Sequence, residues 1–129
     1  MKVSQAMSKA VVIDDNITLR EAAKIMSQKD IANVIVVTDG KIKGFVSEMD
    51  VLTNLNNLDK PVSKSMSKKV ITISADASIS EAGKIMADSQ IRRLPVVKNG
   101  KLVGAISFRD VIRHGSENAE SDEGDFFFN

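Results

Sequence analysis

The sequence lacks cysteine, tryptophan and tyrosine, and it contains one histidine among its 129 residues. Without cysteine there is no disulfide, no thiolate nucleophile and no cysteine-based zinc site. The single histidine, His114, cannot build a histidine metal site. We therefore expect no metal site and no catalytic residue, and we expect that the protein is not an enzyme.

Long apolar runs and a strong excess of charge are missing as well. No apolar run approaches the roughly 20 residues that span a bilayer, and residues 1–5 lack the apolar stretch of a signal peptide. From this we expect a cytoplasmic location and no membrane partner. The 18 basic and 17 acidic side chains leave a net charge of +1.

What the sequence does contain is an internal repeat. Residues 21–26, Glu-Ala-Ala-Lys-Ile-Met, return 60 positions later as Glu-Ala-Gly-Lys-Ile-Met. Upstream, residues 3–8 return as residues 62–67 with a shift of 59. Two copies of one structural unit are therefore predicted.

The repeat predicts the domain boundaries. The first copy is expected in residues 1–60 and the second in residues 61–115. Residues 116–129 belong to neither copy. They are polar and acidic up to a final Phe-Phe-Phe-Asn, and their composition predicts a disordered acidic tail.

Both copies carry the same local signals. Thr18 and Ser78 are each followed three residues later by a glutamate, a capping box that predicts the beginning of a helix. Asp-Gly at 39–40 and Asn-Gly at 99–100 lie between apolar runs and predict tight β-hairpins. With a short strand before each helix and a helix after each hairpin, the predicted order is β-α-β-β-α.

The predicted fold class is α+β. A unit of under 60 residues with one apolar sheet face is marginally stable alone. We therefore expect the two repeats to pack about a pseudo-twofold axis with their sheets face to face.

A motif closes each repeat at the junction of the last strand and the following helix. It reads Gly-x-x-Ser-x-x-Asp, with Gly44, Ser47 and Asp50 in the first repeat, and it returns at residues 104–110. A helix start of this kind can hold a phosphate at its N–H groups, and the aspartate can bind ribose hydroxyls. The glycine leaves room for a base or sugar close to the backbone. Ser-x-x-Asp is equally a plain capping box, so both interpretations stay open.

Taken together, the motifs resemble a tandem pair of CBS domains, named after cystathionine β-synthase, over almost all of residues 3–114. The resemblance rests on Met-Ser at 7–8 and 66–67, the capped Glu-Ala-x-Lys-Ile-Met helices, Arg-Leu-Pro-Val-Val at 93–97, the glycine hairpins and the closing motifs. It implies a stand-alone regulatory module with no required cofactor. Such a module binds an adenosine nucleotide of the AMP, ADP or ATP type, with S-adenosylmethionine or NADH as alternatives, in the cleft between the repeats.

The resemblance also implies partners. A module of this family signals to a separate effector protein, as an energy sensor does, and commonly forms a flat homodimer through exposed helix faces. Met26, Met86 and the leucines between residues 52 and 58 are candidates for such a face.

The ligand-binding residues carry over from the family pattern. The motif aspartates Asp50 and Asp110 are expected to bind the ribose diol, with Ser47 and Ser107 near the ribose or phosphate. The residues expected beside the adenine are Ser8, Ile13 and Ile31 in the first site, and Thr72, Ile91 and Pro95 in the second.

Phosphate contacts in this family come from the opposite repeat, just before its second strand. This implies that Arg92 and Arg93 face the Asp50 site, whereas the first repeat offers only Ala32 and Asn33. An arginine fork suits a phosphate. A nucleotide is therefore expected to prefer the Asp50 site.

Two other functions remain open. The basic residues of the second repeat could bind nucleic acid, although the lack of tyrosine and tryptophan leaves no obvious platform for base stacking. The chain could also be a purely structural dimerisation module with empty sites. Salt-dependent binding of DNA or RNA would indicate the first alternative. A lack of binding to every adenosine ligand would indicate the second.

Overall fold

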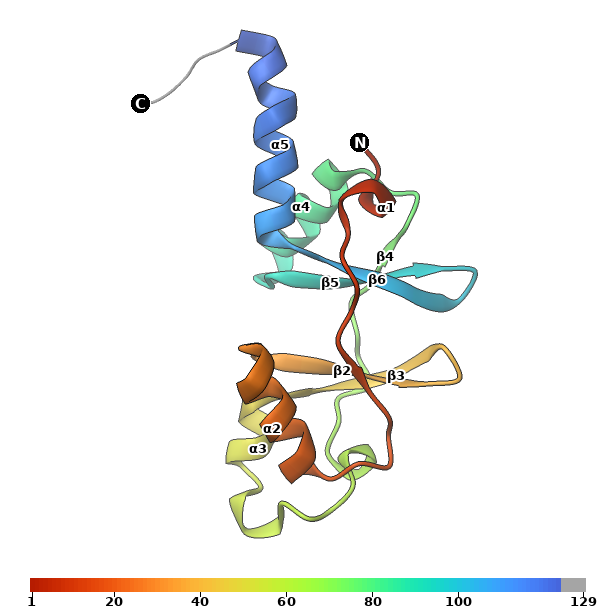
Figure 1. Ribbon diagram of the computed structural model, residues 1–129, viewed down its shortest axis with the longest axis vertical. Helices are drawn as coiled ribbons and strands as arrows, with labels where there is room; N and C mark the ends of the chain where they lie inside the picture. The colour runs from red at the N-terminus through yellow and green to blue at the C-terminus, as the bar shows by residue number, and fades with distance from the viewer. Residues whose placement is uncertain (124–129) are drawn as a thin grey trace. The chain divides into compact units, whose positions relative to one another are not determined.

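The computed structural model describes residues 1–123, with side chains described for residues 1–115. It contains two three-stranded sheets with helices, so the α+β prediction is confirmed (Figure 1). The chain forms two compact units. Ala10–Val70 makes up one, here called the first-repeat unit, and Met1–Lys9 together with the chain from Ile71 onward makes up the other, the second-repeat unit.

The first-repeat unit is built on the sheet β1-β2-β3. Strand β1 runs parallel to β2, and β2 runs antiparallel to β3. Helices α2 and α3 lie on the same face of this sheet (Figure 1). The elements are β1 (Val12–Ile13), α2 (Leu19–Lys29), β2 (Asn33–Thr38), β3 (Lys41–Ser47), α3 (Glu48–Leu52) and the 3-10 helices η1 (Leu55–Asn57) and η2 (Val62–Lys64).

The second-repeat unit has the same topology in the sheet β4-β5-β6. Its elements are α1 (Val3–Ala6), β4 (Ile73–Ser74), α4 (Ile79–Ser89), β5 (Arg93–Lys98), β6 (Lys101–Ser107) and α5 (Phe108–Glu123). Within residues 1–123, no helix combines the length and the apolar character needed to cross a membrane.

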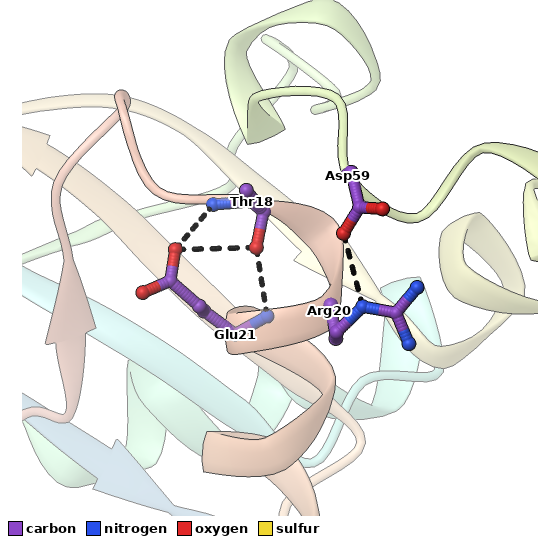
Figure 2. A network of polar contacts seen from close by, with 4 residues as sticks. All are labelled: Thr18, Arg20, Glu21 and Asp59. Carbon is purple, nitrogen blue, oxygen red and sulfur yellow. Dashed lines mark hydrogen bonds and ion pairs between the residues drawn. The ribbon is translucent and has the colours of Figure 1, made fainter.

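Helix α2 begins at the predicted capping box. The Thr18 hydroxyl accepts a hydrogen bond from the Glu21 N–H (3.1 Å), and the Glu21 carboxylate accepts one from the Thr18 N–H (2.9 Å) (Figure 2). Ser78 and Glu81 form the same box at α4. Both helices therefore begin where the sequence predicts.

An ion pair stands beside the first of these caps. Arg20 Nε donates to Asp59 Oδ1 at 3.0 Å (Figure 2). This hydrogen bond and the positive charge of Arg20 lower the pKa of the Asp59 carboxyl. Both side chains are exposed, so the pair contributes little to stability.

The hairpin turns are confirmed as well. Asp39 and Gly40 have φ of 54° and 79°, and Asn99 and Gly100 have φ of 54° and 77°. Two successive positive φ values are typical of a type I′ turn, whose twist matches the flanking strands.

The segment that begins each repeat, residues 3–8 or residues 62–67, is called its leading segment. Each leading segment belongs to the compact unit of the other repeat. Val3 is fully buried in the core of the second-repeat unit, and its N–H donates to the Ala77 carbonyl at 2.8 Å. Ser8 exchanges two backbone hydrogen bonds with Ala105 in β6, both 2.9 Å long, and Ser67 does the same with Phe45 in β3. The compact units therefore differ from the expected division into residues 1–60 and 61–115, because the leading segments are exchanged.

Chain length explains the exchange. In the first-repeat unit, Val12, Ile35, Phe45 and Ser67 stand opposite one another across neighbouring strands. If Ser8 took the place of Ser67, it would be three strand spacings from Val12, about 14 Å. Four residues span at most about 14 Å when fully extended, and this connection would also have to pass over the side chains of the sheet. The first leading segment could serve its own repeat only if every residue of the connection were fully extended along a straight path, so the short connection favours the exchange.

Residues 116–123 differ from the expected disordered tail, because α5 continues through Glu123. The segment from Ser116 to Glu123 contains neither proline nor glycine, so hydrogen bonding that starts at Phe108 can propagate through it. The next residue is Gly124. Residues 124–129, with the three phenylalanines, lie outside the described residues.

Met26 and Met86, expected on a dimer face, belong to the cores of the two units, with 4% and 6% of their surface exposed. Each lies about one turn from a helix residue that is fully buried, Ala22 for Met26 and Ala82 for Met86. The same helical stripe holds them against the sheet.

Candidate functional site

A hollow of about 150 Å³ opens beside the closing motif of the second repeat. All of its lining residues belong to the second-repeat unit. They are Ser8, Lys9, Arg93, Ala105, Ser107 and Asp110.

Strand register brings these residues together. Arg93 at the start of β5 pairs with Ser107 at the end of β6. Ala105, two residues earlier on β6, pairs with Ser8 on the strand's other side. Residues that lie far apart in the sequence thus meet at one corner of the sheet.

Gly104 allows the leading segment to reach this corner. A Cβ on Gly104 would lie 2.7 Å from Met7 Sδ and 2.8 Å from the Ser8 carbonyl oxygen, closer than real contacts permit. Gly44 is enclosed in the same way by Met66 and Ser67. The two glycines therefore make room for the protein's own backbone, which accounts for both of them without a ligand.

Ser107 and Asp110 form a capping box at the start of α5. The Asp110 N–H donates to Ser107 Oγ (3.2 Å), and Asp110 Oδ2 accepts from the Ser107 N–H (2.9 Å) and hydroxyl (3.0 Å). Ser47 and Asp50 repeat these bonds at α3. The capping interpretation of the motif is therefore confirmed at both places.

Capping does not use up the Asp110 carboxylate. The carboxylate accepts its two bonds from Ser107 at Oδ2 and leaves Oδ1, which lies 3.8 Å from a guanidinium nitrogen of Arg113. A carboxylate offers about four acceptor positions. The Asp110 side chain is 13% exposed, so a ligand hydroxyl can still reach it from the hollow.

Positive charge lies on the same hollow. Lys9 and Arg93 line it and are both exposed. Arg93, which the family pattern assigns to the Asp50 site, lines the hollow beside Asp110 in its own unit. Arg92 stands apart from it, with its guanidinium carbon 4.4 Å from the centre of the Phe108 ring, and its carbonyl accepts from the Phe108 N–H.

The residues expected beside an adenine in the first site do not share one unit. Ile13 is 5% exposed in the core of the first-repeat unit, and Ile31 packs against that core. Ser8 lines the hollow at Asp110 instead. Side chains alternate along a strand, so Val12, 45% exposed beside the buried Ile13, is the outward residue of β1.

The three residues expected beside an adenine in the second site lie in different places within the second-repeat unit. Ile91 packs against the core, Pro95 is buried in β5, and Thr72 immediately precedes β4. Pro95 stands opposite Ala105 in the hairpin, which places it next to the strand that lines the hollow. None of the three lines the hollow itself.

Lys9 and Ala105 line the hollow but were not predicted. A signal for Lys9 was present, because Ser-Lys occurs at 8–9 and again at 67–68. No sequence signal pointed to Ala105, since a small apolar residue within a strand usually indicates packing alone.

Solved structures share this fold. The CBS domain pair of protein MJ0100, in complex with methylthioadenosine and S-adenosyl-L-methionine, matches with a TM-score of 0.76 and 26% identity over 92% of this chain and 98% of the other. CBSX2 in complex with AMP matches with a TM-score of 0.81 and 22% identity, again over 92% and 98% of the two chains.

Sequence relatives point the same way. A 17.7 kDa protein of Acidianus ambivalens is 37% identical over 87% of this chain and 71% of its own length. The CBS domain-containing protein YhcV of Bacillus subtilis is 32% identical over 81% of this chain and 77% of its own. A homoserine O-acetyltransferase of Methanohalophilus mahii is 34% identical over 83% of this chain, but the match spans 23% of that enzyme. A family model of the CBS domain matches residues 3–57 and again residues 62–117, and the chain therefore belongs to the CBS domain family as a tandem pair.

Proposed function

We propose that this CBS pair is a non-catalytic regulatory module that binds an adenosine nucleotide at its Ser-x-x-Asp sites. The observation that carries the proposal is the hollow of the second-repeat unit, which joins the Asp110 carboxylate to Lys9 and Arg93. A carboxylate accepts from ribose hydroxyls, and the two cations attract phosphate. Related CBS pairs hold adenosine compounds, AMP in one and S-adenosyl-L-methionine in another, which supports this assignment.

The size of the hollow limits what it holds. Pockets for whole small molecules usually measure about 300–1,000 Å³, whereas this hollow measures about 150 Å³. The hollow therefore takes the ribose and phosphate of a nucleotide and leaves the base outside it.

Calorimetry tests the proposal directly. We expect at least one of AMP, ADP and ATP to bind the wild type, and the double variant Asp50→Asn/Asp110→Asn to bind that nucleotide at least about 10-fold more weakly, because each exchange removes a charged acceptor. Asparagine keeps an oxygen for the helix cap, and circular dichroism checks the fold. S-adenosylmethionine, NADH and a short DNA and RNA serve as competitors. Absence of nucleotide binding, or unchanged binding by the double variant, would refute the proposal.

Exposed apolar side chains support a further role in assembly. Met49, Leu52 and Leu55 on α3 and η1 are 63%, 58% and 60% exposed, and Ile112 on α5 is 59% exposed. We expect these residues to lie in a homodimer or to contact an effector protein. Sedimentation should show a dimer that Leu52→Asp dissociates, and a monomeric wild type would contradict the homodimer.

A further inference from the structure

The two repeats build the same corner from the same backbone. Arg93 pairs with Ser107 as Asn33 pairs with Ser47. Ala105 bridges to Ser8 as Phe45 bridges to Ser67. The capping boxes at Asp110 and Asp50 have nearly identical distances. Differences between the two corners therefore come from their side chains.

One difference is steric. Ala105 lines the hollow, and its neighbour Ile106 is fully buried on the other face of the strand. Phe45 occupies the same register position, beside the fully buried Val46. Because side chains alternate along a strand, Phe45 puts a phenyl ring on the wall where the second-repeat unit has a methyl group.

The other difference is electrostatic. Arg93 carries a permanent charge and two parallel N–H donors, whereas Asn33 at the equivalent strand start is neutral. The lysines at the two corners, Lys9 and Lys68, are the same in both repeats. Only the corner at Asp110 thus combines open space with an arginine.

We propose that the two sites are inequivalent, with Ala105 and Arg93 making the Asp110 corner the one that takes the ribose phosphate of a nucleotide, while Phe45 and Asn33 disable the Asp50 corner. This inference rests on the proposed function and names the ligand chemistry of one site. It reverses the preference for Asp50 that the family pattern implies, because Arg93 lines the hollow of its own unit.

The charge of the hollow also selects among adenosine ligands. Lys9 and Arg93 exceed the single carboxylate of Asp110, and Arg113 adds a cation 3.8 Å from that carboxylate. The hollow therefore favours an anionic phosphate over the uncharged end of adenosine or the sulfonium of S-adenosylmethionine. AMP and adenosine share base and ribose, so the difference between their affinities measures the phosphate contact alone.

The experiment compares AMP with adenosine by calorimetry at low and at physiological salt. In the wild type, AMP should bind about 10-fold or more tightly than adenosine, with one AMP per chain. Arg93→Asn, which installs the residue of the other repeat on an exposed position, should remove this advantage and leave adenosine unchanged. Lys98→Asn is the matched control, because Lys98 is an exposed cation at the far end of the same strand; it should keep the advantage.

Exchanging Ala105 and Phe45 between the repeats tests the steric part of the inference. Ala105→Phe should abolish AMP binding, and Asn33→Arg combined with Phe45→Ala should raise the stoichiometry from one AMP to two. The gain of a site cannot result from misfolding, so it keeps the test decisive if Ala105→Phe fails to fold. Two results would overturn this inference and leave the proposed function standing. One is an AMP affinity that Arg93→Asn does not change, and the other is a larger loss of AMP affinity in Asp50→Asn than in Asp110→Asn. Absence of binding by the wild type would overturn both.

Discussion

Val3→Asp should unfold the second-repeat unit, although residue 3 belongs to the first repeat by sequence. Val3 is fully buried in the core that includes Leu94 and Ile106. Burying an unpaired carboxylate costs several kcal/mol, and losing the valine side chain costs about 1.5–3 kcal/mol more. The sum is comparable with the whole stability of a small domain, about 5–15 kcal/mol.

Hydrogen exchange followed by mass spectrometry measures this unfolding segment by segment. In Val3→Asp, protection should be lost first in residues 73–107. The control is Ser4→Asp, which adds the same charge at the adjacent, exposed position and should leave protection unchanged. Val62→Asp, in the equivalent place of the first-repeat unit, should remove protection from residues 12–47. Loss of protection in residues 12–47 alone after Val3→Asp would contradict the exchange of leading segments.

Local features could be predicted from the sequence because their causes are local. The capping box at Thr18 needs a hydroxyl and a carboxylate three residues apart, and the turn at Asp39 needs two residues that tolerate positive φ. No distant contact alters these requirements. Helices α2 and α4 and both hairpins therefore lie where the sequence places them.

The exchange of leading segments could not be predicted in the same way. Residues 3–8 and 62–67 have similar sequences, so each fits the corner at Gly44 as well as the corner at Gly104. Which corner each one takes depends on the reach of the chain from Ser8 to Val12, and this distance is known only once the strand order is known. The packing role of Gly44 and Gly104 could not be predicted for the same reason, because their neighbour is a distant segment of the chain.

The candidate site was predicted in part. Ser107 and Asp110, which the motif singles out, line the hollow together, since the motif is local to one strand end. Arg93 was assigned to the opposite repeat because the family pattern says so, and only the pairing of Arg93 with Ser107 shows that it also borders its own aspartate. Ala105 could not be singled out from the sequence, because its importance lies in being smaller than Phe45. The strand register shows that the two residues occupy the same position in the two corners.

The exchange also predicts which fragments of the chain fold. A fragment of residues 10–70 should show a cooperative thermal transition at low temperature, whereas a fragment of residues 1–60 should not. The first contains all eight buried residues of its core, including Val62, and the bridge from Ser67 to Phe45. The second lacks Val62 and Ser67, and its residues 1–9 lack the sheet on which they pack. Circular dichroism and thermal melting of the two fragments measure the difference.

The similar length of the two fragments makes the comparison informative, because a domain of about 60 residues is marginal in either case. Fragment 1–60 could recover only if residues 3–8 replaced residues 62–67 at β3. The four-residue connection from Ser8 to Val12 covers the three strand spacings only when it is fully extended, with no length left to pass over the side chains of the sheet. Inserting a flexible linker of about ten residues after Ser8 removes this limit and should restore folding to fragment 1–60. Equal folding of fragment 1–60 without the linker would show that chain reach does not cause the exchange. Restoration by the linker alone would show that the exchange is imposed by a short connection, and that the first leading segment can complete the corner at Gly44.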